Sequence, residues 1–150
     1  MRPGLKDGVL HARSVLHRAV FALSGGRLLA TWGGLPVVML TTVGWRTGKR
    51  RTTIVVAPLT VGESVVLVAS DGGAPRHPRW YLNLSASPDV EVLFMGRRMH
   101  MRARTAGEGE KATLWPRITA GSPSYGRYQN RTARDIPVVL LEPAEGAEET

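Results

Sequence analysis

Cationic side chains crowd one short stretch of the sequence, where four of them fall within six residues. They are Arg46, Lys49, Arg50 and Arg51. Cations this close repel one another unless water or an anion neutralises them, and Gly44 and Gly48 allow backbone N–H groups to turn toward such an anion. The cluster therefore predicts either a phosphate-binding turn or a solvated basic turn. It is not a Walker loop, because the order G-x-x-x-x-G-K-[ST] is absent.

A second cluster, A-S-D-G-G-A at residues 69–74, directly follows a β-branched run. Two adjacent glycines between a strand and a helix let a flat ligand lie against bare backbone, with Trp80 and Tyr81 as aromatic walls. A purely structural core position explains Trp80 equally well. We interpret His77 as a helix-start or hydrogen-bonding residue, because no second histidine or carboxylate stands at metal-ligand spacing.

The third cluster contains Tyr125 and Tyr128, which are three residues apart and therefore share one face of a helix or turn. Their hydroxyls can donate hydrogen bonds to a substrate oxygen, although tyrosines are more often structural. No Ser-His-Asp order and no closely paired carboxylates indicate hydrolysis. The absence of cysteine excludes disulfides, thiolate zinc sites and iron–sulfur clusters.

The net charge of +8 is unevenly distributed along the 150 residues. Residues 1–62 carry nine basic residues against the single acid Asp7, whereas residues 63–150 carry eleven of each sign. A phosphate-bearing ligand, a nucleic acid or an anionic membrane should therefore meet the first part of the chain, unless the excess serves solubility alone.

The elements that must position these clusters are mostly strands. Runs rich in β-branched residues predict strands at about 36–43, 51–60, 64–70, 90–95, 98–105 and 136–142. Short glycine turns at 47–49, 61–63 and 95–97 indicate hairpins, so neighbouring strands should be antiparallel. The sequence predicts helices over residues 77–86 and 108–119. The second has Glu108 and Glu110 at its N-terminus, the positive end of the helix dipole.

The two ends of the chain have patterns of their own. The apolar spacing from Leu10 to Leu23 predicts an amphipathic helix over about 10–23, which packs on its own domain or lies on an anionic membrane. Residues 1–143 are expected to form a single domain, and 144–150 a disordered acidic tail. Glycines and a proline within 28–45 break what would otherwise be a membrane-helix candidate.

Taken in order, the three clusters resemble one family. The sequences TTVGWRTGKRRT, VASDGGAPRHPRWYLNLSASPDVEV and LWPRITAGSPSYGRYQNRTARDIPVVLLEP are similar to the deazaflavin-dependent nitroreductase family over roughly residues 27–143. The resemblance implies a mainly β, mostly antiparallel split β-barrel with flanking helices, related to the flavin-mononucleotide (FMN) barrels. It also implies coenzyme F420, held with its phosphate and glutamate tail among cations.

The resemblance assigns roles by position. It implies that Arg46, Thr47, Gly48 and Arg51 hold the phosphate and carboxylate tail, and Arg50 is expected to join them. Backbone donors for the deazaflavin ring would come from Ser70, Asp71, Gly72, Gly73 and Ala74. Trp80 would flank the ring, and Tyr125 and Tyr128 would line the substrate pocket.

The expected activity is an F420-dependent oxidoreductase that passes a hydride to an electrophilic quinone, enone or nitro compound, with Tyr128 or Tyr125 donating to the acceptor oxygen. Three alternatives stay open: an FMN- or haem-binding split barrel, a basic nucleic-acid-binding module, and a non-catalytic cofactor carrier. A cytoplasmic location is the default, with peripheral membrane contact through the 10–23 helix as an option. No metal and no nucleic-acid partner are expected, and the oligomeric state is not predicted.

Overall fold

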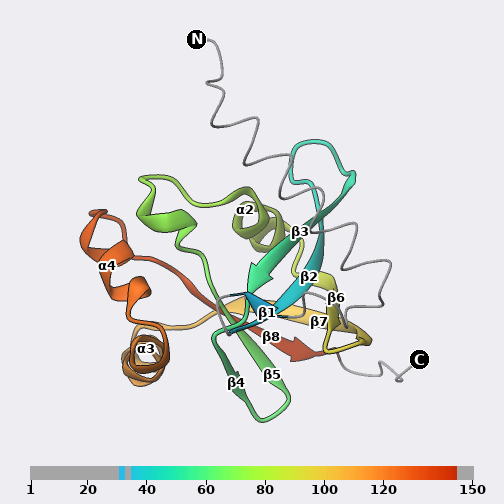
Figure 1. Cartoon of the computed structure of the whole chain (residues 1–150). Coiled ribbons are helices and arrows are strands. Elements are labelled where there is room, and N and C mark those ends of the chain that lie inside the picture. The colour runs from blue at the N-terminus through green and yellow to red at the C-terminus, as the bar shows by residue number, and fades with distance from the viewer. Residues whose placement is uncertain (1–30, 33–34, 145–150) are drawn as a thin grey trace.

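The computed structural model describes residues 31–32 and 35–144, and it shows a bent antiparallel sheet flanked by helices (Figure 1). The strands are β1 (Thr31–Trp32), β2 (Leu35–Val43), β3 (Arg50–Val56), β4 (Leu59–Val61), β5 (Ser64–Val68), β6 (Asp89–Phe94), β7 (Arg97–Thr105) and β8 (Val138–Pro143). The helical elements are the short 3-10 helix η1 (Asp71–Gly73), α2 (Arg79–Ala86), α3 (Glu108–Gly121) and α4 (Ser124–Asn130). The expected helix over 10–23 and the tail residues 145–150 lie outside the described residues.

The strands pair in the order β1-β2-β6-β7-β8-β5-β4, and β3 pairs with β2 on its other edge. Every pairing is antiparallel, as the hairpin turns predicted. Within the described ranges β3 pairs only with β2 and β4 only with β5, so the barrel-like sheet does not close. The expectation of a mainly β, split-barrel-like fold is confirmed.

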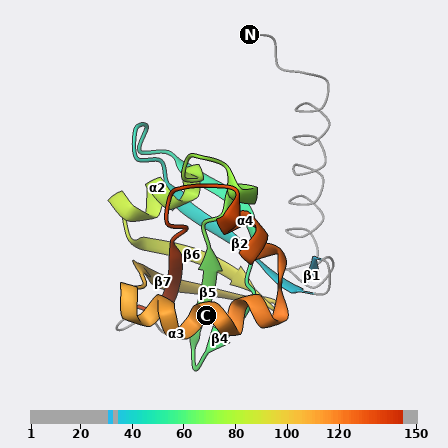
Figure 2. The ribbon, with the colours of Figure 1, turned by 90° about the vertical axis from the view of Figure 1, so that its left-hand side faces the viewer.

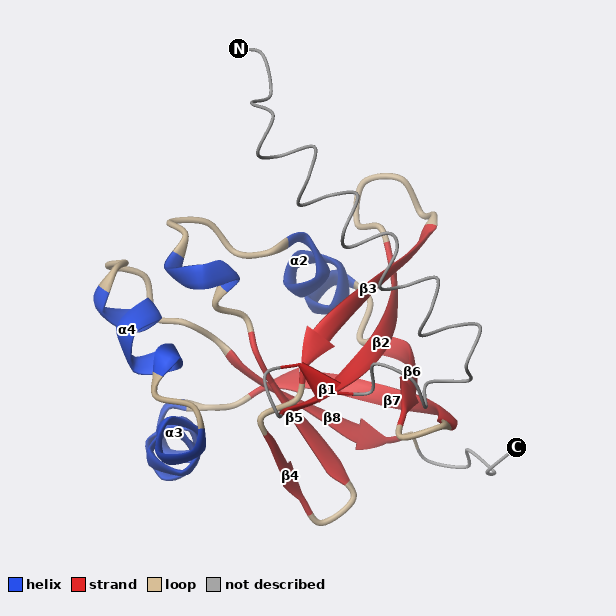
Figure 3. Cartoon of the chain, viewed as in Figure 1, coloured by secondary structure: helices blue, strands red, loops and turns tan. Residues whose placement is uncertain are grey.

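Two apolar cores account for the packing of the helices, whose places beside the sheet can be followed in Figure 2. The inner core gathers alternate residues of β2, β5, β6, β7 and β8, with Leu84 of α2 packed against them. On the opposite face of β5 and β8, α3 and α4 bury Leu114, Ile118 and Tyr125 against the strands. Because successive strand residues point to opposite faces, β5 and β8 are apolar on both sides and β7 only on one. Figure 3 shows the helices outside the bent sheet.

The structure corrects one expectation about the elements and answers one open question. The strand expected over 51–60 is divided at Ala57 and Pro58, where the Ala57 N–H bonds the carbonyl of Pro36 and Pro58 has no N–H to continue the ladder. The segment around the tyrosines, left as a helix or turn, is the helix α4, and η1 interrupts the loop after β5. Among the described helices, none combines the length and the apolar character needed to cross a membrane.

Candidate functional site

The tip of the β2–β3 hairpin presents the basic cluster. Gly44 closes the tip: its N–H bonds the Lys49 carbonyl at 2.7 Å, and its own carbonyl accepts the Gly48 N–H at 2.8 Å. The Thr47 hydroxyl accepts a hydrogen bond from the Lys49 N–H at 3.2 Å, so it stabilises the turn itself. Arg46 stacks over the Trp45 ring at 4.4 Å. The tip is therefore an ordered, exposed turn that carries cations outward.

Arg50 and Arg51 are neighbours on β3, and their side chains leave the strand on opposite faces. Arg50 pairs with Glu91 of β6 on the outer face. Arg51 stands opposite Thr42 in the ladder and shares its inner face. Of the carboxylates that the structure describes, none forms an ion pair with Arg51, Arg46 or Lys49. Arg51 is consequently better suited to an anionic ligand than Arg50, whose charge is already balanced.

Asn83 of α2 connects the hairpin to the rest of the candidate site. Its side chain is buried, its Oδ1 accepts the Trp45 N–H at 3.0 Å, and its Nδ2 donates to Thr42 Oγ1 at 3.1 Å. A buried amide that satisfies both of its groups in this way fixes the orientation of its partners. Asn83 thus holds the hairpin tip against α2, a role that the sequence analysis did not identify.

The loop after β5 has a left-handed backbone over three consecutive residues. Asp71, Gly72 and Gly73 have φ values of 45°, 64° and 84°. A Cβ on Gly73 would lie 2.7 Å from the carbonyl oxygen of Tyr128, so glycine is required there by both backbone conformation and space. This close approach places η1 directly against α4 and brings the second and third clusters together.

Arg134, in the segment between α4 and β8, holds this loop from behind. Its guanidinium donates to the carbonyls of Ala69 (3.1 Å), Ser70 (2.8 Å) and Ala74 (2.8 Å). Its Nη1 also lies 3.1 Å from Nδ1 of His77. Burial, and then the charge of Arg134, lower the pKa of His77, so the imidazole is neutral and Nδ1 accepts from the arginine.

The two tyrosines of α4 have different surroundings. Tyr125 is buried in the outer core, and burial, reinforced by Tyr128, raises its pKa to about 12. Tyr128 is half-buried and meets the Tyr125 ring edge-on at 5.9 Å. Arg131 lies 5.6 Å from the Tyr128 ring and donates to the Gly72 carbonyl at 3.4 Å. Tyr128 is therefore the tyrosine at the junction with the glycine loop.

The structure gathers most of the expected site residues at one end of the sheet. Figures 1 and 2 show the β2–β3 tip, α2 and the loop that contains η1 at this end, with α4 beside the loop. Asn83 links the tip to α2, and Gly73 links η1 to α4. Trp80 packs partly buried against the inner core and meets Tyr81 edge-on at 6.4 Å.

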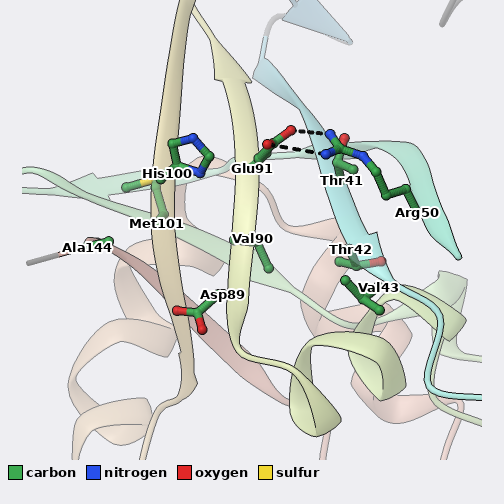
Figure 4. A pocket seen from close by; sticks show the side chains of 10 residues that line it. All are labelled: Thr41, Thr42, Val43, Arg50, Asp89, Val90, Glu91, His100, Met101 and Ala144. Carbon is green, nitrogen blue, oxygen red and sulfur yellow. Dashed lines mark hydrogen bonds and ion pairs between the residues drawn. The ribbon is translucent and has the colours of Figure 1, made fainter. Parts of the chain in front are cut away.

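Arg50 also lines a groove of about 330 Å³ on the sheet, where its ion pair with Glu91 lies near His100 (Figure 4). Another hollow, of about 500 Å³, lies between the β4–β5 and β6–β7 hairpins and contains none of the expected site residues. Within residues 31–32 and 35–144, no group of histidines and carboxylates could hold a metal ion.

Comparisons with known proteins show which proteins this chain is similar to. A family model described as F420H(2)-dependent quinone reductase matches residues 13–143. The F420H(2)-dependent quinone reductase Rv1261c of Mycobacterium tuberculosis is 37% identical over 130 residues, which cover 84% of this chain and 87% of that protein.

Two solved structures are similar in both sequence and fold. One is an F420-H2-dependent reductase, FDR-A, with a TM-score of 0.64, 35% identity, and coverage of 71% of this chain and 94% of that one. The other is a domain-swapped dimer with a TM-score of 0.66 and 30% identity, covering 85% and 96% of the two chains.

Proposed function

The chain belongs to the F420H(2)-dependent quinone reductase family, and from this premise we propose that it reduces quinones with the two-electron carrier F420. When bound, reduced F420 supplies the hydride, and the quinone gains that hydride and a proton to become the hydroquinone. The observation that carries the proposal is the junction of three clusters at one end of the sheet: a basic turn, a glycine loop and a tyrosine beside it.

The donor set at this junction suits a flat, anionic ligand. The exposed turn offers Arg46, Lys49 and Arg51, and cations of this kind make charge-assisted hydrogen bonds to phosphate and carboxylate groups. In the described chain the N–H groups of Ser70 and Asp71 donate to no protein acceptor, so they are available to polar edges of a ring. The roles of these residues as tail and ring contacts follow from the resemblance and from this chemistry.

Protein groups near Tyr128 would act on the acceptor. Its hydroxyl donates no hydrogen bond to any described residue, so it can donate to a quinone oxygen as negative charge develops there. The guanidinium of Arg131 beside its ring adds positive charge to the same region. The chain's contribution is then to place the acceptor and to stabilise the oxygen, with the redox chemistry supplied by the cofactor.

A titration with competing cofactors tests the proposal. Purified protein is titrated with oxidised F420 and with FMN, and the reduced form of the ligand that binds is then mixed with menadione. We expect tighter binding of F420, because FMN lacks the extended polyanionic tail that Arg46 and Arg51 can meet, followed by oxidation of the reduced cofactor by the quinone. Equal or tighter binding of FMN at moderate ionic strength contradicts the proposal, as does a reduced F420 complex that menadione does not oxidise.

A further inference from the structure

The unusual feature of Arg134 is that one guanidinium binds several atoms of a single loop far away in the sequence. Nε, Nη1 and Nη2 reach the carbonyls of Ala74, Ala69 and Ser70, which precede the arginine by 60 to 65 residues. No described carboxylate pairs with it. An arginine normally meets a carboxylate in this fork-like way, so its use on backbone carbonyls points to control of backbone direction.

Peptide planarity turns these contacts into an orientation of donors. In a trans peptide the C=O of one residue and the N–H of the next point in opposite directions. Because the Ala69 and Ser70 carbonyls face Arg134, the N–H groups of Ser70 and Asp71 must point away from it. Both of these N–H groups lack an acceptor in the described part of the chain.

Arg134 is itself held firmly by its neighbours. Its carbonyl accepts from Gln129 Nε2 at 2.8 Å, and Gln129 Oε1 accepts the Ile136 N–H at 3.0 Å. The Lys111 ammonium donates to the Ile136 carbonyl at 2.6 Å. The backbone is thus held at Arg134 and two residues beyond it, so the guanidinium is pre-organised before it meets the loop.

We propose that Arg134 is the positioning residue of the cofactor loop: it holds the Ala69 and Ser70 carbonyls and thereby aims the Ser70 and Asp71 N–H groups at the bound ring. The proposal rests on the proposed F420-dependent function. Arg134 acts through the backbone, and its charge, which no described carboxylate neutralises, adds positive potential behind the two donors.

The test compares Arg134→Ala and Arg134→Lys with Arg104→Ala. Arg104 is the matched control because it also makes several contacts, to Glu110 and Glu142, but touches no residue of the loop. Amide resonances of Ser70 and Asp71 in the cofactor-free full chain report the direction of the donors, and equilibrium titration with F420 reports affinity. Ethylguanidinium at millimolar concentration is added to each alanine variant to replace the missing group.

We expect the Ser70 and Asp71 amide resonances to move in both Arg134 variants and to stay in place in Arg104→Ala. The dissociation constant for F420 should rise about tenfold or more in Arg134→Ala and Arg134→Lys, because the compact ammonium of lysine lacks the planar fork whose three separate nitrogens reach the three carbonyls. Ethylguanidinium should restore F420 affinity in Arg134→Ala and have no effect in Arg104→Ala. If Arg134→Ala bound weakly only because the fold was less stable, the added guanidinium would not restore its affinity.

Several results would overturn the positioning role. Unshifted Ser70 and Asp71 amides in Arg134→Ala would do so, as would F420 affinity within about twofold of wild type or an equal loss in Arg104→Ala. If Arg134→Ala does not fold, Arg134→Lys carries the same two readouts. A wild-type protein that fails to bind F420 overturns the proposed function, whereas normal binding with unshifted amides overturns only the role of Arg134.

Discussion

Arg51 is the cation of the hairpin whose position best suits an anionic tail, because it shares the inner face with Thr42 and forms no ion pair with a described carboxylate. We expect Arg51→Ala to weaken F420 binding by about 1.5–3 kcal/mol, the range for a charge-assisted hydrogen bond, without loss of folding. Lys49→Ala should have the smaller effect in the same calorimetric titration. If neither substitution changes the dissociation constant, the hairpin tip is only a solvated basic turn.

Tyr128 is expected to assist turnover and not cofactor binding. Tyr128→Phe keeps the ring that packs on Tyr125 and removes only the hydroxyl, so F420 affinity should hardly change. Turnover should fall by less than about 100-fold, below the usual contribution of a general acid, because a hydroquinone anion can take its proton later from water.

Stopped-flow oxidation of reduced F420 by menadione measures this effect, with Tyr125→Phe as the comparison. Tyr125 stays protonated because burial raises its pKa to about 12, but it is buried in the outer core. Unchanged rates in both variants would make the two tyrosines structural residues only.

His77 should make stability depend on pH. Its pKa is lowered in the folded protein, first by burial and then by Arg134, so the native state binds protons less readily than the unfolded chain. Its contribution is therefore complete above the ordinary histidine pKa of about 6.5 and is lost as pH falls from there through the lowered pKa.

Thermal unfolding between about pH 7.5 and 5 tests this expectation, since the range spans the ordinary histidine pKa. The midpoint of wild type should fall more steeply with acidification than that of His77→Gln, which still offers an acceptor to Arg134 but does not titrate. Parallel curves for wild type and His77→Gln would show that the imidazole is not held neutral.

Residue chemistry was only partly predictable from the sequence. Clustering along the chain identified the basic turn, the glycine pair and the tyrosines, because each lies within a few neighbouring residues. Asn83 and Arg134 gave no such signal, since their partners are 38 to 65 residues away and are backbone groups or the side chains of Thr42 and His77. The Arg50–Glu91 pair was missed for a similar reason, because it depends on the register of β2 with β6.

At the scale of elements, η1 and α4 form a contact that tolerates no side chain. Gly73 has φ 84° and no room for a Cβ beside the Tyr128 carbonyl, whereas Gly72 has φ 64° and open space. Gly73→Ala should therefore lower the free energy of unfolding by about 2–4 kcal/mol, through backbone strain and overpacking together. Gly72→Ala, with the strain alone, should cost about 1–2 kcal/mol. Urea denaturation measures the free energy of unfolding of both variants. An equal loss in the two would mean that α4 moves away from the added Cβ at little cost.

Strands were easier to predict than the elements that carry the site. The β-branched content of β2, β5 and β8 indicates strands directly. The break at Ala57 and Pro58 was missed because the residues around it remain β-branched, and only the bond from Ala57 to Pro36 reveals the bend. The helix α4 contains Gly126 in seven residues, so its helical character depends on packing against β5 and β8 more than on propensity.

For the molecule as a whole, the uneven charge predicts a salt-dependent affinity. The basic excess of residues 1–62 includes the hairpin tip, whose cations are exposed and therefore screened by added salt. The dissociation constant for F420 should rise steadily as potassium chloride increases from about 0.05 M to 0.5 M, whereas the KM of an uncharged quinone should hardly change. A cofactor affinity that is independent of salt would show that the tip makes no ionic contact with the tail.

The contact between Gly73 and the Tyr128 carbonyl has a practical consequence for engineering. It joins backbone to backbone, so it does not depend on which side chains the rest of α4 carries. The side chains of Ser124, Arg127 and Gln129 are exposed or half-buried and take no part in this contact. Gln129 must nevertheless be kept, because it bonds Arg134 and Ile136. A library that varies residues 124 and 127 should therefore change the surface of α4 while the cofactor loop keeps its shape.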